Sequence, residues 1–120
     1  MLSISRGYKY YLYGKACDMR KGFDCLSGLV QNEFAQNPLS GDIFIFFNLH
    51  RTHVKLLQWQ GDGFAMFYKR LEKGTYEIPE ISPASISVEL SCQQLLLILE
   101  GISLLSVKKR VRYQQLVQGY

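Results

Sequence analysis

Short blocks of predominantly apolar residues, separated by turn-like polar segments, run along the chain, which is the pattern of β-strands. Aromatic and β-branched residues, which favour strands, are concentrated at 8–13, 43–48, 52–59 and 64–70. Turn-like segments separate the last three blocks, so these strands are expected to pair as consecutive hairpins. A shorter block at 75–78 predicts one further strand.

Two other segments have the spacing of amphipathic helices. Between residues 22 and 34, apolar residues recur at three- and four-residue steps, which places them on one helix face. The second helix is expected at 92–100, where Ser91 is suited to the N-cap and Gln94 to its capping-box partner. The sequence therefore predicts an α+β fold, an antiparallel β-meander of about four to five strands packed with two α-helices.

The second hairpin predicts a specific register, because Trp59 and Phe64 flank a four-residue turn. One face of this hairpin combines apolar residues near Trp59 with cationic residues toward Arg70, whereas the other face has the composition of a core. The first face carries the opposed pairs Trp59 and Phe64, Leu57 and Met66, Lys55 and Tyr68, and His53 and Arg70, and the second carries Val54, Leu56 and Phe67, joined by Ile43 and Ile45.

The charge is distributed unevenly between the body of the chain and its C-terminal end. The 120 residues carry a formal net charge of +4, and removal of four basic residues near the C-terminus leaves ten basic and ten acidic residues. We therefore expect a single domain over residues 1–107 and a basic tail over 108–120. Such a tail fits either phosphate contacts or a solvated chain end. The four basic residues of the tail are Lys108, Lys109, Arg110 and Arg112.

The apolar runs are too short for membrane insertion. The longest, 43–47 and 95–99, have five residues each, whereas a membrane span needs roughly 20 and a signal-peptide core roughly 7–15. A cytoplasmic protein without membrane association is expected. Three widely spaced cysteines are typical of reduced thiols and leave their roles open. These are Cys17, Cys25 and Cys92.

The sequence contains no recognisable catalytic or metal-binding constellation. A metal-dependent nuclease needs converging carboxylates, but the candidate carboxylates fall in turns or at element ends, where local backbone chemistry explains them. His50 and His53 have no accompanying Cys-x-x-Cys pair, and no phosphate-binding loop occurs. We expect no catalytic, cofactor or metal site, and a protein that is not an enzyme. The carboxylates considered are Asp18, Asp24, Asp42, Asp62 and Glu72.

Three blocks of residues, with a weaker match at 99–102, resemble a known family and together cover roughly residues 8 to 102. The sequence is similar to the accessory proteins called TnpB, the products of the second open reading frame of the sixty-sixth family of bacterial insertion sequences. It departs at Cys25, where such proteins have glycine, and at Leu49-His50, which replaces an arginine-rich turn. The blocks are 11–13 with 18–24 and 26–30; 38–42 with Phe44, Phe46 and Asn48; and Arg51-Thr52, 55–57, Trp59, 63–64, 68–72 and Gly74.

The resemblance implies a role in transposition. Such proteins accompany a separately encoded transposase, which holds the catalytic carboxylates. We therefore expect an accessory protein that assists the transposase by binding DNA ends, the transposase, or both. The alternative is a protein–protein interaction module without direct DNA contact. The transposase of the same element is the implied partner, while DNA binding and homo-oligomer formation stay open.

The candidate binding residues cluster on the cationic face of the second hairpin. Lysine and arginine contact phosphates, and aromatic rings provide stacking surfaces. The same residue types anchor protein interfaces. Alternatively, a helix that covers this sheet face would bury Trp59, and lysine or arginine stems would cover the apolar surface while their charged ends reach water. Charge reversal of Lys55 and Arg70 is expected to weaken binding without loss of thermal stability. The candidates are Arg20, Lys21, His53, Lys55, Trp59, Tyr68, Lys69 and Arg70, with Lys108, Lys109, Arg110 and Arg112 in the tail.

Overall fold

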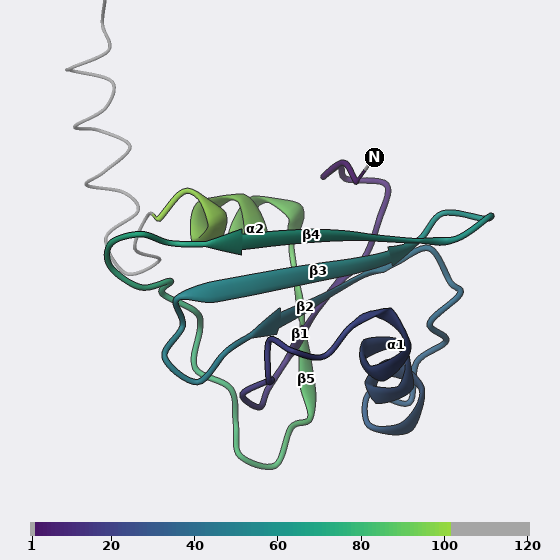
Figure 1. Cartoon of the computed structure of the whole chain (residues 1–120), viewed down its shortest axis with the longest axis horizontal. Helices are drawn as coiled ribbons and strands as arrows, with labels where there is room; N and C mark the ends of the chain where they lie inside the picture. The colour runs from purple at the N-terminus through teal and green to yellow at the C-terminus, as the bar shows by residue number, and fades with distance from the viewer. Residues whose placement is uncertain (1, 102–120) are drawn as a thin grey trace, which may run out of the picture.

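Short strands rich in aromatic and β-branched residues pair into one five-stranded sheet that lies between two helices (Figure 1). The computed structural model describes residues 2–101. The predicted α+β class is confirmed, with five strands and two helices in the described part of the chain. The elements are β1 (Tyr10–Tyr13), α1 (Phe23–Asn32), β2 (Ile43–Phe47), β3 (His53–Trp59), β4 (Phe64–Arg70), β5 (Ser87–Leu90) and α2 (Cys92–Leu99).

The strand order is β4-β3-β2-β1-β5, and the hairpin strands are antiparallel as predicted. The register of the second hairpin is also confirmed, because Trp59 pairs with Phe64 and His53 with Arg70. The expectation of an all-antiparallel sheet is wrong in one place, since β1 runs parallel to β2. The chain returns from β1 to β2 through α1, and a helical crossover joins parallel strands.

The strand expected at 75–78 is not formed. Tyr76 instead enters the core, where its ring lies 5.3 Å from that of Phe47, and its backbone N–H donates to the Arg51 carbonyl at 2.7 Å. The fifth strand is β5, which pairs antiparallel with β1. The sequence prediction chose the segment with the better strand composition, but tertiary packing placed the pairing about ten residues later along the chain.

The two helices follow the sequence pattern closely. Helix α1 is shorter than the predicted 22–34 and ends before Ala35, which has a positive φ of 53°. In α2 the predicted capping box is confirmed, because the Ser91 hydroxyl accepts from the Gln94 N–H at 3.0 Å. The Gln94 side chain accepts in turn from the Ser91 N–H at 2.8 Å.

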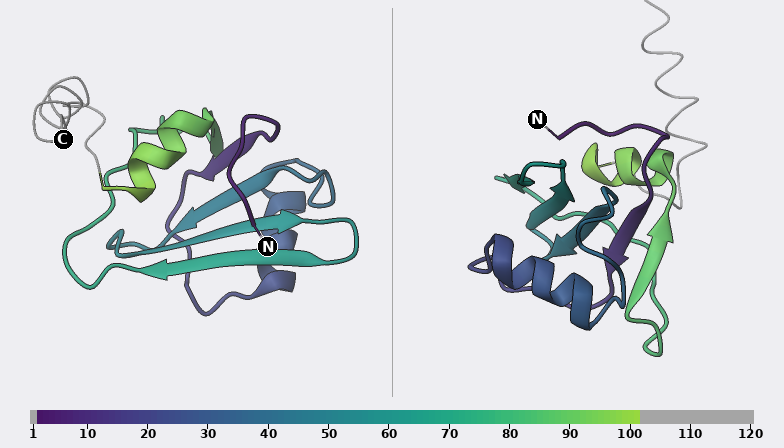
Figure 2. Two further views of the ribbon diagram at one scale, coloured as in Figure 1. Left: turned by 90° about the horizontal axis from the view of Figure 1, so that it is seen from above. Right: turned by 90° about the vertical axis from the view of Figure 1, so that its right-hand side faces the viewer.

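Both faces of the sheet are core, whereas the sequence predicted only one. Helix α1 covers the face that carries Phe44 and Leu57, and α2 covers the face that carries Ile45 and Leu56 (Figure 2). We call these the α1 face and the α2 face. A central strand such as β2, which is buried at every position, needs cover on both sides. Phe67, which was predicted in the core, is 39% exposed because β4 is the outermost strand.

Two predictions cannot be compared with this fold. The basic tail and the domain boundary at residue 107 lie outside the described residues. Within residues 2–101, no helix is long and apolar enough to cross a membrane.

Candidate interaction surface

Lys55 is a buried cation that fastens a loop to the sheet. Only 6% of its surface is exposed, and its Nζ donates to the carbonyl oxygens of Met19 at 2.6 Å and Lys21 at 2.8 Å. The same Nζ lies 4.7 Å from the centre of the Tyr68 ring. A buried ammonium group needs such partners, because burial without them is very costly. The structure therefore gives Lys55 a structural role and does not expose it to a phosphate.

The loop that Lys55 fastens is a tight turn built by Asp18. The Asp18 carboxylate accepts from the Arg20 backbone N–H at 2.8 Å and from the Arg20 guanidinium Nη2 at 2.7 Å. The hydrogen bonds from Arg20 lower the pKa of Asp18 to about 2. The Arg20 side chain is 91% exposed. The turn thus presents an arginine to solvent whose charge is already compensated.

Tyr68 and the start of β3 complete the surface. Tyr68 is 52% exposed, and its ring lies 6.0 Å from that of His53. Arg70 is the cross-strand neighbour of His53, and its guanidinium pairs with Glu72 at 2.8 Å. We define the loop–strand surface as Arg20, Lys21, His53, Tyr68 and Arg70, which lie around the buried Lys55.

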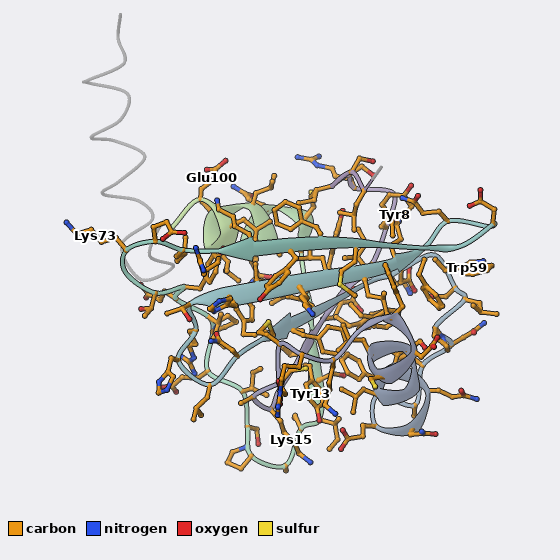
Figure 3. The ribbon with its side chains drawn as sticks, viewed as in Figure 1. Tyr8, Tyr13, Lys15, Trp59, Lys73 and Glu100 are labelled. Atoms are coloured by element: carbon orange, nitrogen blue, oxygen red, sulfur yellow. The ribbon has the colours of Figure 1, made fainter. Side chains whose placement is uncertain are left out.

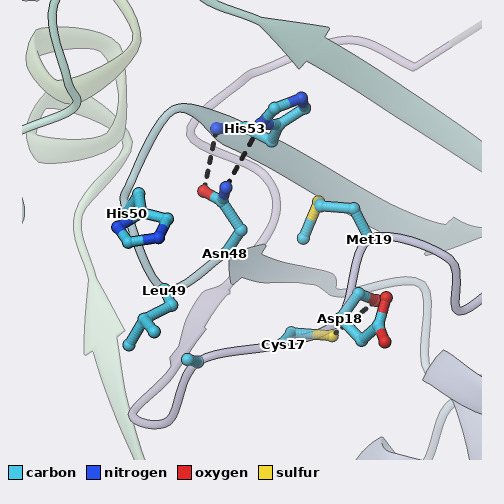
Figure 4. Close-up of a pocket in the computed structure, with 8 residues that line it drawn as sticks. Cys17, Asp18, Met19, Asn48, Leu49, His50 and His53 are labelled. Carbon is cyan, nitrogen blue, oxygen red and sulfur yellow. Dashed lines mark hydrogen bonds between the residues drawn. The ribbon is translucent and has the colours of Figure 1, made fainter.

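A pocket of about 380 Å³ adjoins this surface between the Asp18 loop and the β2–β3 turn (Figure 4). Asn48 holds the turn in shape, because its Oδ1 accepts from the backbone N–H groups of Thr52 at 2.9 Å and His53 at 3.0 Å. Leu49 is 73% exposed at the rim. The pocket combines apolar walls with two imidazoles, an amide and a carboxylate. Its lining residues are Ala16, Cys17, Asp18, Met19, Asn48, Leu49, His50 and His53.

The residue pattern alone does not indicate this pocket. Its available signal was Leu49, an apolar residue in a turn between two strands, where a polar residue is expected. No local pattern indicates that the Asp18 loop forms the other wall of the pocket. That loop lies about thirty residues before the β2–β3 turn and is brought next to it only by the fold.

Three groups of predicted binding residues lie elsewhere. Trp59 is at the opposite end of β3, where it packs edge-to-face on Phe64 at 5.1 Å (Figure 3). Lys69 is exposed. It lies on the α2 face, opposite to Tyr68, because successive side chains of a strand point to opposite faces of the sheet. The four basic tail residues lie outside the described part of the chain.

The ionisable groups of the described residues show no metal-binding arrangement. Within residues 2–101, no group of three or more histidine, cysteine, aspartate or glutamate side chains is placed to hold a metal ion. Cys17 is buried, and burial raises the pKa of its thiol, which favours the protonated form. Cys25 is exposed, Cys92 is half-buried, and all three thiols are free.

Comparison with known proteins identifies the family. The sequence matches the family described as IS66 Orf2 like protein over residues 8–109. It is 26% identical over 110 residues to the uncharacterized protein y4jC of Sinorhizobium fredii (strain NBRC 101917 / NGR234), which covers 92% of each chain. It is 33% identical over 98 residues to the uncharacterized protein y4hO of the same organism, which covers 76% of this chain and 85% of the relative. No solved structure matches significantly. The chain belongs to the IS66 Orf2-like family of insertion-sequence proteins, whose role is that of transposition accessory proteins.

Proposed function

We propose that this protein assists transposition by binding the transposase of its own element through the loop–strand surface. In this proposal it does not itself cleave or join DNA strands. One observation carries the proposal: Tyr68 is half exposed above a buried Lys55, with Arg70 two positions along the same strand face and the loop that carries Arg20 bound to the same Lys55. Aromatic and arginine side chains are the residue types enriched in the centres of protein interfaces.

The acidic neighbours of the arginines, Asp18 and Glu72, reduce the net positive charge of this surface, which argues against tight phosphate binding. Affinity for DNA comes largely from excess positive charge, which displaces counterions from the phosphates. Arg20 is bound to Asp18, Arg70 is bound to Glu72, and the Lys55 ammonium donates to backbone carbonyls. Lys21 is left as the one cation of the surface without an ion pair within the described residues. We therefore expect weak DNA binding here.

The alternative function is DNA binding through the C-terminal end. The four basic residues between positions 108 and 112 account for the whole net charge of the chain. Binding of that kind would depend steeply on salt and little on DNA sequence.

The proposal is tested by Tyr68→Ala in the full chain, titrated against the purified transposase of the same element by interferometry. Loss of a central aromatic anchor should weaken binding by about tenfold or more. Tyr8→Ala is the matched control, because Tyr8 is another exposed tyrosine and lies outside the loop–strand surface. The control should bind as the unmodified chain does.

Lys21→Glu provides a second, charge-based test of the same surface. It should weaken transposase binding more than Lys73→Glu, which makes the same charge change in the exposed loop after β4. Equal binding by Tyr68→Ala, Lys21→Glu and both controls would exclude the loop–strand surface as the transposase-binding site.

A further inference from the structure

The outer edge of β4 is a strand edge that no other strand of residues 2–101 pairs with. β4 has seven residues and pairs with β3 alone among the described strands, as its place at the border of the sheet in Figure 1 shows. Phe67 is 39% and Tyr68 is 52% exposed along this edge. A long exposed edge strand that carries apolar side chains is a template for pairing with another strand.

The flanking hydrogen bonds fix which backbone groups of β4 point outward. Bonds at the two ends of the hairpin, from Gln60 N–H to the Gly63 carbonyl and from Leu71 N–H to the Thr52 carbonyl, are both 2.8 Å long. Hydrogen-bonded and non-hydrogen-bonded pairs alternate in an antiparallel ladder. The odd-numbered residues of β4 therefore bond to β3, and the even-numbered residues direct their N–H and C=O groups away from the sheet. The outward-directed residues are Phe64, Met66, Tyr68 and Arg70.

We propose that two copies of this chain pair through β4, antiparallel and about a two-fold axis at Phe67, so that the two sheets become continuous. This register overlaps all seven residues of both strands and sets outward-directed residues opposite one another, as the hydrogen-bond alternation requires. The cross-subunit neighbours are Phe67 with Phe67 of the second copy, Met66 with Tyr68, Ala65 with Lys69, and Phe64 with Arg70.

The charge pattern of β4 favours a second copy in this orientation. Both cations, Lys69 and Arg70, lie at one end of the strand, and the opposite end is apolar. Antiparallel pairing sets each cationic end against an apolar end, and it sets Arg70 over the ring of Phe64, where a cation–π contact is favourable. The two Lys69 residues are then offset by four strand positions, roughly 14 Å, which exceeds the screening length of about 8 Å. A parallel pairing would place like charges side by side.

The strand is thus complementary to itself, which is what a two-fold symmetric interface requires. This inference does not rest on the proposed function. Tyr68 and Arg70 belong both to the β4 edge and to the loop–strand surface, but the cross-linking test uses Phe67 and Lys69, which lie on the α2 face outside that surface, so the two proposals can fail separately.

Disulfide trapping tests the register directly. In the full chain with Cys25→Ser and Cys92→Ser, the change Phe67→Cys places two thiols across a non-hydrogen-bonded pair. The Cα atoms of such a pair lie about 4.5 Å apart, within the disulfide range of about 4.4–6.8 Å. Mild oxidation should give a covalent dimer. Lys69→Cys is the matched control on the same strand and face, and its two copies lie too far apart to join.

Solution mass gives a second, independent test. The full chain, of 13.9 kDa, should run at twice that mass in light-scattering chromatography. Tyr68→Pro removes an outward N–H without removing a bond to β3, so this variant should be a monomer with an unchanged circular dichroism spectrum. Tyr68→Ala keeps that N–H and should remain a dimer even where it loses transposase binding.

Three results would overturn the inference. They are a monomer at every concentration, a dimer that Tyr68→Pro leaves intact, or cross-linking that is as efficient through Lys69→Cys as through Phe67→Cys.

Discussion

Lys55 shows how one side chain decides the character of the surface around it. Its ammonium group donates to two carbonyls of the Asp18 loop and faces the Tyr68 ring. The interactions of this cation are therefore made within the protein and not with a partner. The sequence placed Lys55 correctly opposite Tyr68. It did not reveal the burial, because the two carbonyls come from residues more than thirty positions earlier in the chain.

This role makes Lys55 a stability residue. Lys55→Met keeps the length of the side chain but leaves two carbonyl oxygens without their donor, which should lower the free energy of unfolding by about 2–3 kcal/mol. Lys55→Glu should destabilise more, because it buries an uncompensated negative charge. Urea denaturation followed by circular dichroism measures both variants.

The control is Lys69→Met, the same substitution at an exposed position of β4, which should change stability by less than about 0.5 kcal/mol. Equal stability of Lys55→Met and Lys69→Met would contradict the structural role. The earlier expectation that reversal of Lys55 spares thermal stability is thereby replaced.

At the scale of elements, the local sequence pattern predicts the structure correctly wherever residues that are close in sequence are also close in space. The second hairpin and the capping box at Ser91 depend on residues a few positions apart, and both were predictable. Strand β5 was not, because its partner β1 lies more than seventy residues earlier. The parallel β1–β2 pairing follows from the α1 crossover, which residue composition alone does not encode.

The capping box at the start of α2 yields a local stability prediction. Ser91→Ala removes the hydroxyl that accepts from the Gln94 N–H and should cost about 1 kcal/mol of unfolding free energy. Ser27→Ala is the control, because Ser27 lies half-buried within α1 and away from the N-cap, where alanine is the better helix former. Thermal unfolding measures both variants. If Ser27→Ala lowered the stability as much as Ser91→Ala does, a specific capping contribution would be contradicted.

At the scale of the whole molecule, the two helices leave different parts of the sheet open. Helices α1 and α2 cover the central strands on both faces, and β4 stays at the border, where its C-terminal residues 67–70 are exposed. The loop–strand surface and the β4 edge lie on this same side and share Tyr68 and Arg70, but pairing through the edge rests mainly on the backbone groups of β4. A dimer through β4 would therefore carry two loop–strand surfaces, and bivalent binding to a transposase multimer would raise the apparent affinity.

The central claim is that the protein contacts the transposase through its folded body and not DNA through its charge. The most direct measurement titrates the full chain, labelled, against the element's transposase and separately against element-end and scrambled DNA duplexes, at two salt concentrations. A full-length variant with Lys108, Lys109, Arg110 and Arg112 changed to glutamine is measured in parallel. The account predicts saturable transposase binding that survives this change, with DNA binding that is weak, equal for both duplexes and lost in the variant. Tight, end-specific DNA binding that persists in the variant, with no binding to the transposase, would contradict it.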